Sequence, residues 1–141
     1  METWQRLEDQ MARIIYVEDD ELAGELVKEV LAEAGHLVGV IQHGTLAFDT
    51  IAFKRPDLVI LDRSLPGMQG MEILTRLRQN AGTYLTPILM LTGKRDTALI
   101  DEALAAGADD YLMKPFQAED LVQRVAAALM SKSFAAHRKI R

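Results

Sequence analysis

The stretch Ile14-Ile15-Tyr16-Val17-Glu18-Asp19-Asp20 joins a short apolar run directly to three acidic residues. Similar junctions recur along the chain, where short apolar runs end at Asp62, at Thr92 and at Lys114. Short apolar runs that alternate with helical stretches predict buried parallel strands. Because ligands of open parallel sheets bind outside the carboxyl ends of the strands, we expect these polar side chains to meet at one sheet edge.

The segments between the apolar runs carry the periodicity of amphipathic helices. The expected helices run from Leu22 to a stop at Gly35, over 46–52 to a stop at Arg55-Pro56, over 73–77, over 97–106 to a stop at Gly107, and over 118–130. One more strand is expected at 37–41, and it carries no acid or lysine. Five βα units with right-handed crossovers predict an α/β fold, namely a doubly wound (βα)5 parallel five-stranded sheet of order 2-1-3-4-5, flavodoxin-like in topology.

The composition indicates one small soluble domain and excludes several classes of protein. The 141 residues are 49% hydrophobic, and the formal net charge of −5 argues against direct binding to nucleic acids or anionic membranes. The chain has no cysteine, which excludes disulfides, thiolate metal sites and cysteine nucleophiles. No apolar run approaches the length of a transmembrane helix, and the polar N-terminus lacks a signal-peptide core, so we expect a cytoplasmic protein.

The polar residues at the strand ends suit a divalent cation beside a phosphoryl group. A carboxylate can accept a phosphoryl group as an acyl phosphate, and the transfer depends mainly on neutralising the moving oxygens. Mg²⁺ prefers carboxylates together with water and phosphate oxygens, which Glu18, Asp19 and Asp62 could complement. Lys114 and Thr92 could each bind a phosphate oxygen. Taken singly, each residue is commonly a helix cap, a turn residue or a solvated charge, and it is their joint placement that argues for a site.

Five motifs follow one another along the chain, and the spacing of their polar residues can be compared with that of known families. They are Ile14 to Asp20, Pro56 to Asp62, Leu65-Pro66-Gly67, Leu91-Thr92 and Ala106 to Phe116. Asp19 and Asp62 lie 43 positions apart, Asp62 and Thr92 lie 30 apart, and Thr92 and Lys114 lie 22 apart. In these motifs and spacings, residues 12–130 resemble the receiver domains of bacterial response regulators.

The resemblance implies that the domain is a phosphorylatable signalling switch. Asp62 would be the phosphoacceptor, and the donor would be a histidine kinase or a histidine phosphotransfer protein. Mg²⁺ would be bound by Asp19, by Glu18 directly or through water, by Asp62 and by the backbone carbonyl of Ser64. The protein would catalyse only its own phosphorylation and dephosphorylation, and it would not otherwise be an enzyme.

The resemblance also implies how the phosphoryl group is held and read. Thr92 and Lys114 would bind it, and the Lys114–Pro115 peptide bond would be cis. Thr92 and Tyr111 would form the switch, in which the tyrosine turns inward when the threonine engages phosphate. The signal would pass to a downstream protein through the face formed by 97–106, 111–113 and 118–130, and the mixed charges of this face leave a homodimer open.

Two further residues are candidates for control of the phosphoryl lifetime. Ser64 and Lys94 each lie two positions after a site residue, where a side chain could orient or block the hydrolytic water. Neither is an acid or an amide, so slow autodephosphorylation is expected if they act at all. The alternative is that both are exposed loop residues without a kinetic effect.

The two ends of the chain leave the type of protein open. Residues 1–11 form an N-terminal extension in which Trp4, Leu7 and Met11 are spaced for a short helix, although a frayed terminus fits equally. Residues 131–141 form a basic tail, which is either an arm for anionic partners or a solvated terminus or linker. A stand-alone receiver is the first interpretation. The alternatives are a pseudo-receiver that only binds proteins, the receiver part of a larger DNA-binding regulator and, more remotely, an aspartate-nucleophile hydrolase.

Overall fold

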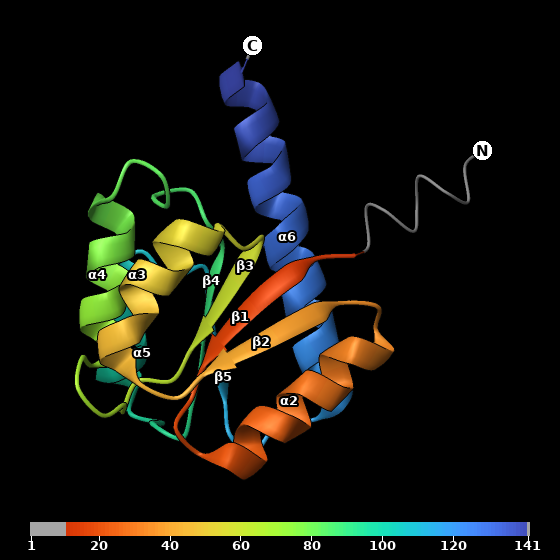
Figure 1. The fold of residues 1–141 in the computed structure, drawn as a ribbon, viewed down its shortest axis with the longest axis vertical. Coiled ribbons are helices and arrows are strands. Elements are labelled where there is room, and N and C mark those ends of the chain that lie inside the picture. Colours follow the sequence, from red (N-terminus) through yellow and green to blue (C-terminus); the bar gives the residue numbers. More distant parts are fainter. Residues whose placement is uncertain (1–10, 141) are drawn as a thin grey trace.

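The computed structural model describes residues 11–140, with side chains as far as Ser131, and its centre is a five-stranded sheet. The strands are β1 (Arg13–Val17), β2 (Leu37–Ile41), β3 (Leu58–Leu61), β4 (Ile88–Thr92) and β5 (Asp110–Met113). All four pairings are parallel, and the strand order is β2-β1-β3-β4-β5 (Figure 1). The predicted fold class and strand order are therefore confirmed.

Helices cover both faces of the sheet. They are α2 (Glu21–Glu33), α3 (Gly44–Lys54), α4 (Gly70–Gln79), α5 (Thr97–Ala105) and α6 (Ala118–Ile140). One core packs the sheet against α3, α4 and α5, and the other packs it against α2 and α6. Neighbouring strand residues alternate between the two cores: Ile15 and Val17 enter the first, whereas Ile14 and Tyr16 enter the second.

Local signals explain where most helices begin and end. The Asp20 side chain caps α2 by accepting from the backbone amide of Leu22 at 3.1 Å, and Asp96 caps α5 in the same way. Gly35 and Gly107 follow the ends of α2 and α5 with φ values of 95° and 114°, which glycine adopts without steric strain. These boundaries agree with the stops predicted from the sequence.

One expectation about the helices is wrong. The last helix was expected to end near Met130, but α6 continues to Ile140 because no glycine or proline follows Met130 to interrupt it. Leu22 and Leu26 recur at helical spacing in the segment that forms α2, yet they are 80% and 51% exposed. The buried stripe of α2 instead passes through Gly24, Val27 and Leu31.

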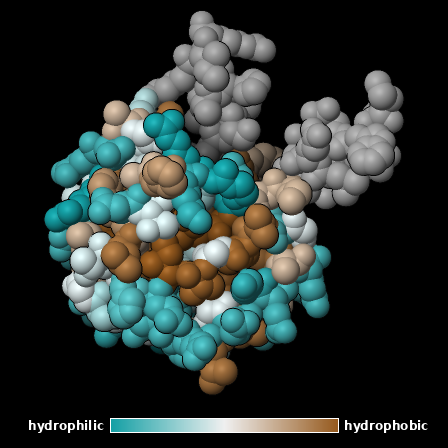
Figure 2. Space-filling model, in the orientation of Figure 1, coloured by the Kyte–Doolittle hydropathy of each residue, from teal (hydrophilic) through white to brown (hydrophobic). Residues whose placement is uncertain are grey.

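The strand β2 forms one edge of the sheet, which faces the viewer in Figures 1 and 2. Figure 2 shows hydrophobic residues gathered across the middle of this face, with hydrophilic residues around them. Leu37 in β2 is exposed. Within residues 11–140, no helix combines the length and the apolar character needed to cross a membrane. The helix suggested by Trp4 and Leu7 lies outside the described residues.

Candidate functional site

Strand register brings the predicted site residues to one edge of the sheet. Val17 pairs with Leu61, so the acidic residues that follow β1 lie beside Asp62, which follows β3. The backbone amide of Asp62 donates to the carbonyl of Val17 at 3.1 Å. On the other side, the backbone amide of Lys114 donates to the carbonyl of Thr92 at 2.9 Å, which places the lysine at the end of β5 beside the threonine.

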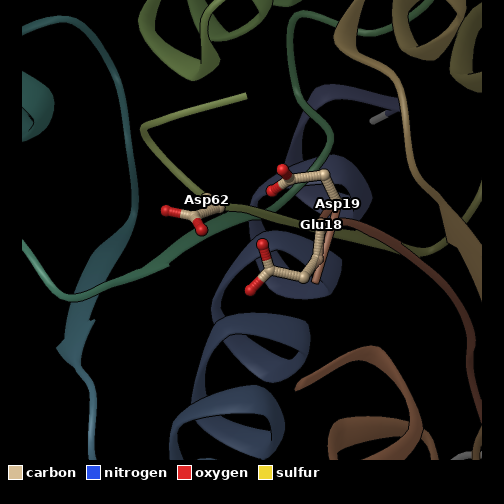
Figure 3. A group of neighbouring side chains, drawn as sticks. All are labelled: Glu18, Asp19 and Asp62. Atoms are coloured by element: carbon tan, nitrogen blue, oxygen red, sulfur yellow. The ribbon is translucent and has the colours of Figure 1, made fainter. Parts of the chain in front are cut away.

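Three carboxylates form a compact cluster at this edge. Carboxylate oxygens of Glu18, Asp19 and Asp62 all lie within 4.8 Å of one another, and Figure 3 shows Glu18 and Asp19 extending from the end of β1 on the side where Asp62 lies. Glu18 is 1% exposed and Asp62 is 9% exposed, whereas Asp19 is open to solvent. Asp20 serves as the cap of α2, so the acidic triplet divides into two site residues and one structural residue.

The donor atoms of this cluster fit Mg²⁺. They are hard carboxylate oxygens, they come from two adjacent strand ends, and Asp19 keeps one side of the cluster accessible to solvent. Mg²⁺ keeps several waters and takes one or two carboxylates, so a cluster that is open on one side suits it better than a closed cage. Glu18, Asp19 and Asp62 are therefore the residues that would hold the cation.

Lys114 supplies a positive charge inside the cluster. Its ammonium group forms ion pairs with Oε1 of Glu18 and, at 3.3 Å, with Oδ2 of Asp62. Burial alone would lower the pKa of Lys114, but the hydrogen bond with Glu18 and the charge of Asp62 raise it above its usual value. The peptide bond between Lys114 and Pro115 is cis, as the resemblance implied. The lysine thus stays charged between the two buried carboxylates.

The surroundings of Asp62 favour its ionised form. Burial by itself would raise the pKa of this carboxyl, but the hydrogen bond with Glu18, the charge of Lys114 and the hydroxyl of Thr92 together lower it. Burial and the neighbouring Asp62 carboxylate raise the pKa of Glu18, and Lys114 only partly offsets this. An ionised carboxylate is the form that can act as a nucleophile, and the environment maintains that form at Asp62.

The loop after β3 is held tightly around Asp62. A Cβ atom on Gly70 would lie 2.1 Å from the backbone carbonyl oxygen of Asp62, so this close approach requires glycine. The backbone amide of Gly70 also donates to the carbonyl of Arg63 at 3.0 Å. Ser64 is exposed, and its backbone amide donates weakly to Oδ1 of Asp62 at 3.4 Å. The predicted role of the Ser64 carbonyl as a metal ligand stays a prediction.

Tyr111 lies in the inward position. It is 7% exposed, it packs in the core beneath α3, α4 and α5, and its hydroxyl donates to the backbone carbonyl of Lys94 at 2.8 Å. Burial raises the pKa of this hydroxyl. The Lys94 side chain is exposed, and its backbone amide lies 3.4 Å from the Thr92 hydroxyl. Thr92 at the end of β4 and Tyr111 in β5 therefore both contact the backbone of Lys94, which lies in the loop that follows β4.

Sequence reasoning missed two residues at this site. Tyr16 is fully buried in β1, its hydroxyl donates to Oε1 of Glu18 at 3.0 Å, and burial raises its pKa far above the usual value. Arg63 reaches from the Asp62 loop to α5, where it donates to the carbonyl of Leu99 at 2.9 Å and forms an ion pair with Glu102. The available signals were an aromatic residue two positions before Glu18, and hence on the same strand face, and a cation directly after Asp62.

Comparisons with known proteins agree with this geometry. Residues 14–126 match the model of the response regulator receiver domain. The DNA-binding response regulator MtrA of Mycolicibacterium paratuberculosis is 45% identical over 117 residues, which are 83% of this chain and 51% of that protein. The chain therefore spans about half the length of the curated relatives it matches.

Solved structures give the same result. The BeF3-activated N-terminal receiver domain of Klebsiella pneumoniae RstA has a TM-score of 0.78 and 35% identity, covering 83% of this chain and 97% of that one. The chemotaxis response regulator CheY4 of Vibrio cholerae has a TM-score of 0.78 and 31% identity, covering 84% and 98%. Both likenesses extend over nearly the whole of the matched domains.

Proposed function

This chain belongs to the response regulator receiver domain family, and we propose that it is a phosphorylatable switch whose phosphoacceptor is Asp62. The observation that carries the proposal is the grouping of Asp62 with Glu18, Asp19 and Lys114 at one sheet edge. The environment that lowers the pKa of Asp62 supports its role as the nucleophile. The phosphoryl donor is a histidine kinase or a histidine phosphotransfer protein in the cytoplasm.

In the proposed reaction, an oxygen of Asp62 attacks the phosphorus of a phosphohistidine. A phosphorus–oxygen bond forms while the phosphorus–nitrogen bond breaks, and the imidazole of the donor leaves with the electron pair. Mg²⁺, held by Glu18, Asp19, Asp62 and the Ser64 carbonyl, would neutralise charge on the phosphoryl oxygens. Lys114 and Thr92 bind two of these oxygens through the ammonium and hydroxyl groups. The chain catalyses no reaction beyond its own phosphorylation and dephosphorylation.

The direct test is covalent modification of the intact chain. With acetyl phosphate and Mg²⁺, mass spectrometry should find a base-labile adduct of about 80 Da on Asp62. Asp62→Asn and Asp19→Asn should fold but remain unmodified, since the first removes the nucleophile and the second removes a cation ligand. Modification of Asp62→Asn at the wild-type rate would contradict the assignment, and a wild-type chain that is never modified would favour a pseudo-receiver.

We propose that phosphorylation stabilises the inward position of Tyr111. When Thr92 turns towards the phosphoryl group, space for the ring is retained beneath α5, and the face formed by α5, β5 and α6 shifts to its signalling arrangement. Beryllofluoride, a mimic of the acyl phosphate, should therefore change NMR amide shifts over 93–116. Changes restricted to the immediate neighbours of Asp62 would argue against this switch.

The lifetime of the acyl phosphate is proposed to be long, because neither Ser64 nor Lys94 can activate water. Lys94→Ala should accelerate phosphate loss if the lysine side chain shields the phosphoryl group, and Ser64→Gln should accelerate it by positioning water. Unchanged decay rates in both variants would assign the two residues to the exposed loop alone.

The role of the whole protein is proposed from its relatives. MtrA is described as a DNA-binding response regulator, and this chain covers about half of its length. The receiver segment carries no proposed contact with DNA, and it acts on a downstream target that is either another protein or a further part of the same polypeptide. Gel-shift assays with the segment alone should find no DNA binding, whereas binding would place a DNA contact on the receiver itself.

A further inference from the structure

The buried oxygen Oε1 of Glu18 has two donors. The Tyr16 hydroxyl donates to it at 3.0 Å, and the Lys114 ammonium donates to the same atom. Tyr16 is fully buried and Glu18 is 1% exposed, so the hydrogen bond between them is closed to solvent. Both residues are on one strand face two positions apart, and this spacing aims the phenol at the carboxylate.

The Lys114 ammonium cannot stay bound to Glu18 when it turns to bind a phosphoryl oxygen. Its ammonium is shared between Oε1 of Glu18 and Oδ2 of Asp62, and the proposed reaction requires it to turn to the phosphoryl group on Asp62. If Lys114 were the sole donor to Oε1, its departure would leave a buried charged acceptor without a hydrogen bond. Such a loss is costly because water cannot readily enter a buried position.

We propose that Tyr16 is a positioning residue that holds Oε1 of Glu18 while Lys114 turns to the phosphoryl group. The phenol keeps the carboxylate satisfied and fixed in direction, so its second oxygen remains directed to the cation cluster. Tyr16 thereby lowers the free energy of the phosphorylated state relative to the free state. This inference rests on the proposed function and adds a residue that neither bonds to the phosphoryl group nor ligates the cation.

The test compares two binding steps in Tyr16→Phe, which removes the hydroxyl and keeps the ring. Mg²⁺ affinity is measured first by NMR titration, and beryllofluoride affinity is then measured by fluorine NMR at saturating Mg²⁺. We expect beryllofluoride to bind about tenfold more weakly, since one hydrogen bond to a buried charged group is missing in the bound state. Mg²⁺ affinity should change by no more than about twofold because Lys114 stays on Glu18 in that step.

A control variant and a measurement on the wild-type protein separate a positioning role of Tyr16 from a packing role. Tyr84→Phe removes a phenol hydroxyl from the loop before β4, at the opposite edge of the sheet, and should leave both affinities at the wild-type value. In the wild-type protein, the Tyr16 hydroxyl proton should shift downfield when beryllofluoride binds, since its hydrogen bond strengthens as Lys114 leaves. The second measurement needs no variant and therefore does not depend on how Tyr16→Phe folds.

The outcomes are distinguishable. Wild-type beryllofluoride affinity in Tyr16→Phe, an equal loss in both binding steps, or an unshifted hydroxyl proton would each overturn the role of Tyr16 while the receiver function stands. A wild-type protein that binds neither Mg²⁺ nor beryllofluoride would overturn the proposed function, and this inference with it.

Discussion

Replacing Lys114 with Met removes the cation that lies between the two buried carboxylates of the site. The ammonium is 3.3 Å from Oδ2 of Asp62 and also forms an ion pair with Glu18. At this distance a single pair is worth about 5 kcal/mol at an effective dielectric constant of about 20. The gain is reduced because the lysine side chain is 25% exposed and because the methionine has no charge to desolvate. We therefore expect Lys114→Met to lower the free energy of unfolding by about 2–3 kcal/mol near neutral pH without Mg²⁺.

The loss should depend on pH and on Mg²⁺ in a defined direction. Without the ammonium, burial and the mutual repulsion of Glu18 and Asp62 raise their folded-state pKa values above the usual values of about 4. A carboxyl with a raised folded-state pKa stabilises the fold in its protonated form. The stability deficit is therefore smallest below the unfolded-state pKa and grows as pH rises through the folded-state pKa. Mg²⁺ should reduce the deficit by replacing part of the missing positive charge.

Urea unfolding followed by circular dichroism, at about pH 7.5 and about pH 5 and with and without Mg²⁺, measures all three effects. The matched control is Lys28→Met, which replaces an exposed lysine on α2 and should change stability by less than about 0.5 kcal/mol. The reasoning is refuted if Lys114→Met is as stable as Lys28→Met. It is also refuted if the deficit is the same at both pH values and unaffected by Mg²⁺.

Gly70→Ala should lower the free energy of unfolding by at least about 2 kcal/mol and slow phosphorylation, because its Cβ would lie 2.1 Å from the carbonyl oxygen of Asp62; Gly39→Ala, which meets nothing within 4 Å, is the control in both assays. Arg78→Met should lower the free energy of unfolding in urea by about 3 kcal/mol, and a loss of less than about 1 kcal/mol would contradict this. The largely buried guanidinium donates to three backbone carbonyls before β4, to the carbonyl of Gly107 at 2.9 Å and to the carboxylate of Asp109 at 3.0 Å. His36 accepts a backbone hydrogen bond at 3.1 Å through Nδ1, and burial lowers its pKa below 6.5. The contribution of neutral His36 to stability should be complete above pH 6.5 and be lost as pH falls through the folded-state pKa. His36→Gln should remove this pH dependence from the free energy of unfolding measured in urea.

The fold was predictable because its signals are local and repeated. Each of the four junctions at Glu18, Asp62, Thr92 and Lys114 combines an apolar run with a polar residue, and the helical segments between them carry a period that a strand does not have. Glycines at the ends of α2 and α5 marked boundaries that the structure reproduces. The end of α6 could not be predicted from such boundary residues, because no glycine or proline follows Met130. The predicted end near Met130 came only from the expected limit of the receiver domain at residue 130.

The sequence by itself determined that the polar residues following β1, β3, β4 and β5 approach one site, because parallel pairing must bring the carboxyl ends of the strands to one edge. The sequence could not determine which carboxylate oxygens accept the hydrogen bonds of Tyr16 and Lys114. In the acidic triplet, Asp20 caps a helix whereas Glu18 accepts from Tyr16 and Lys114, and this division depends on the reach of the lysine side chain from the end of β5 to the end of β1. The exposure of Leu22 likewise depends on which face of α2 meets the sheet. Tertiary structure decides these details because hydrogen bonding and burial act between residues far apart in the chain, where periodicity and spacing carry no information.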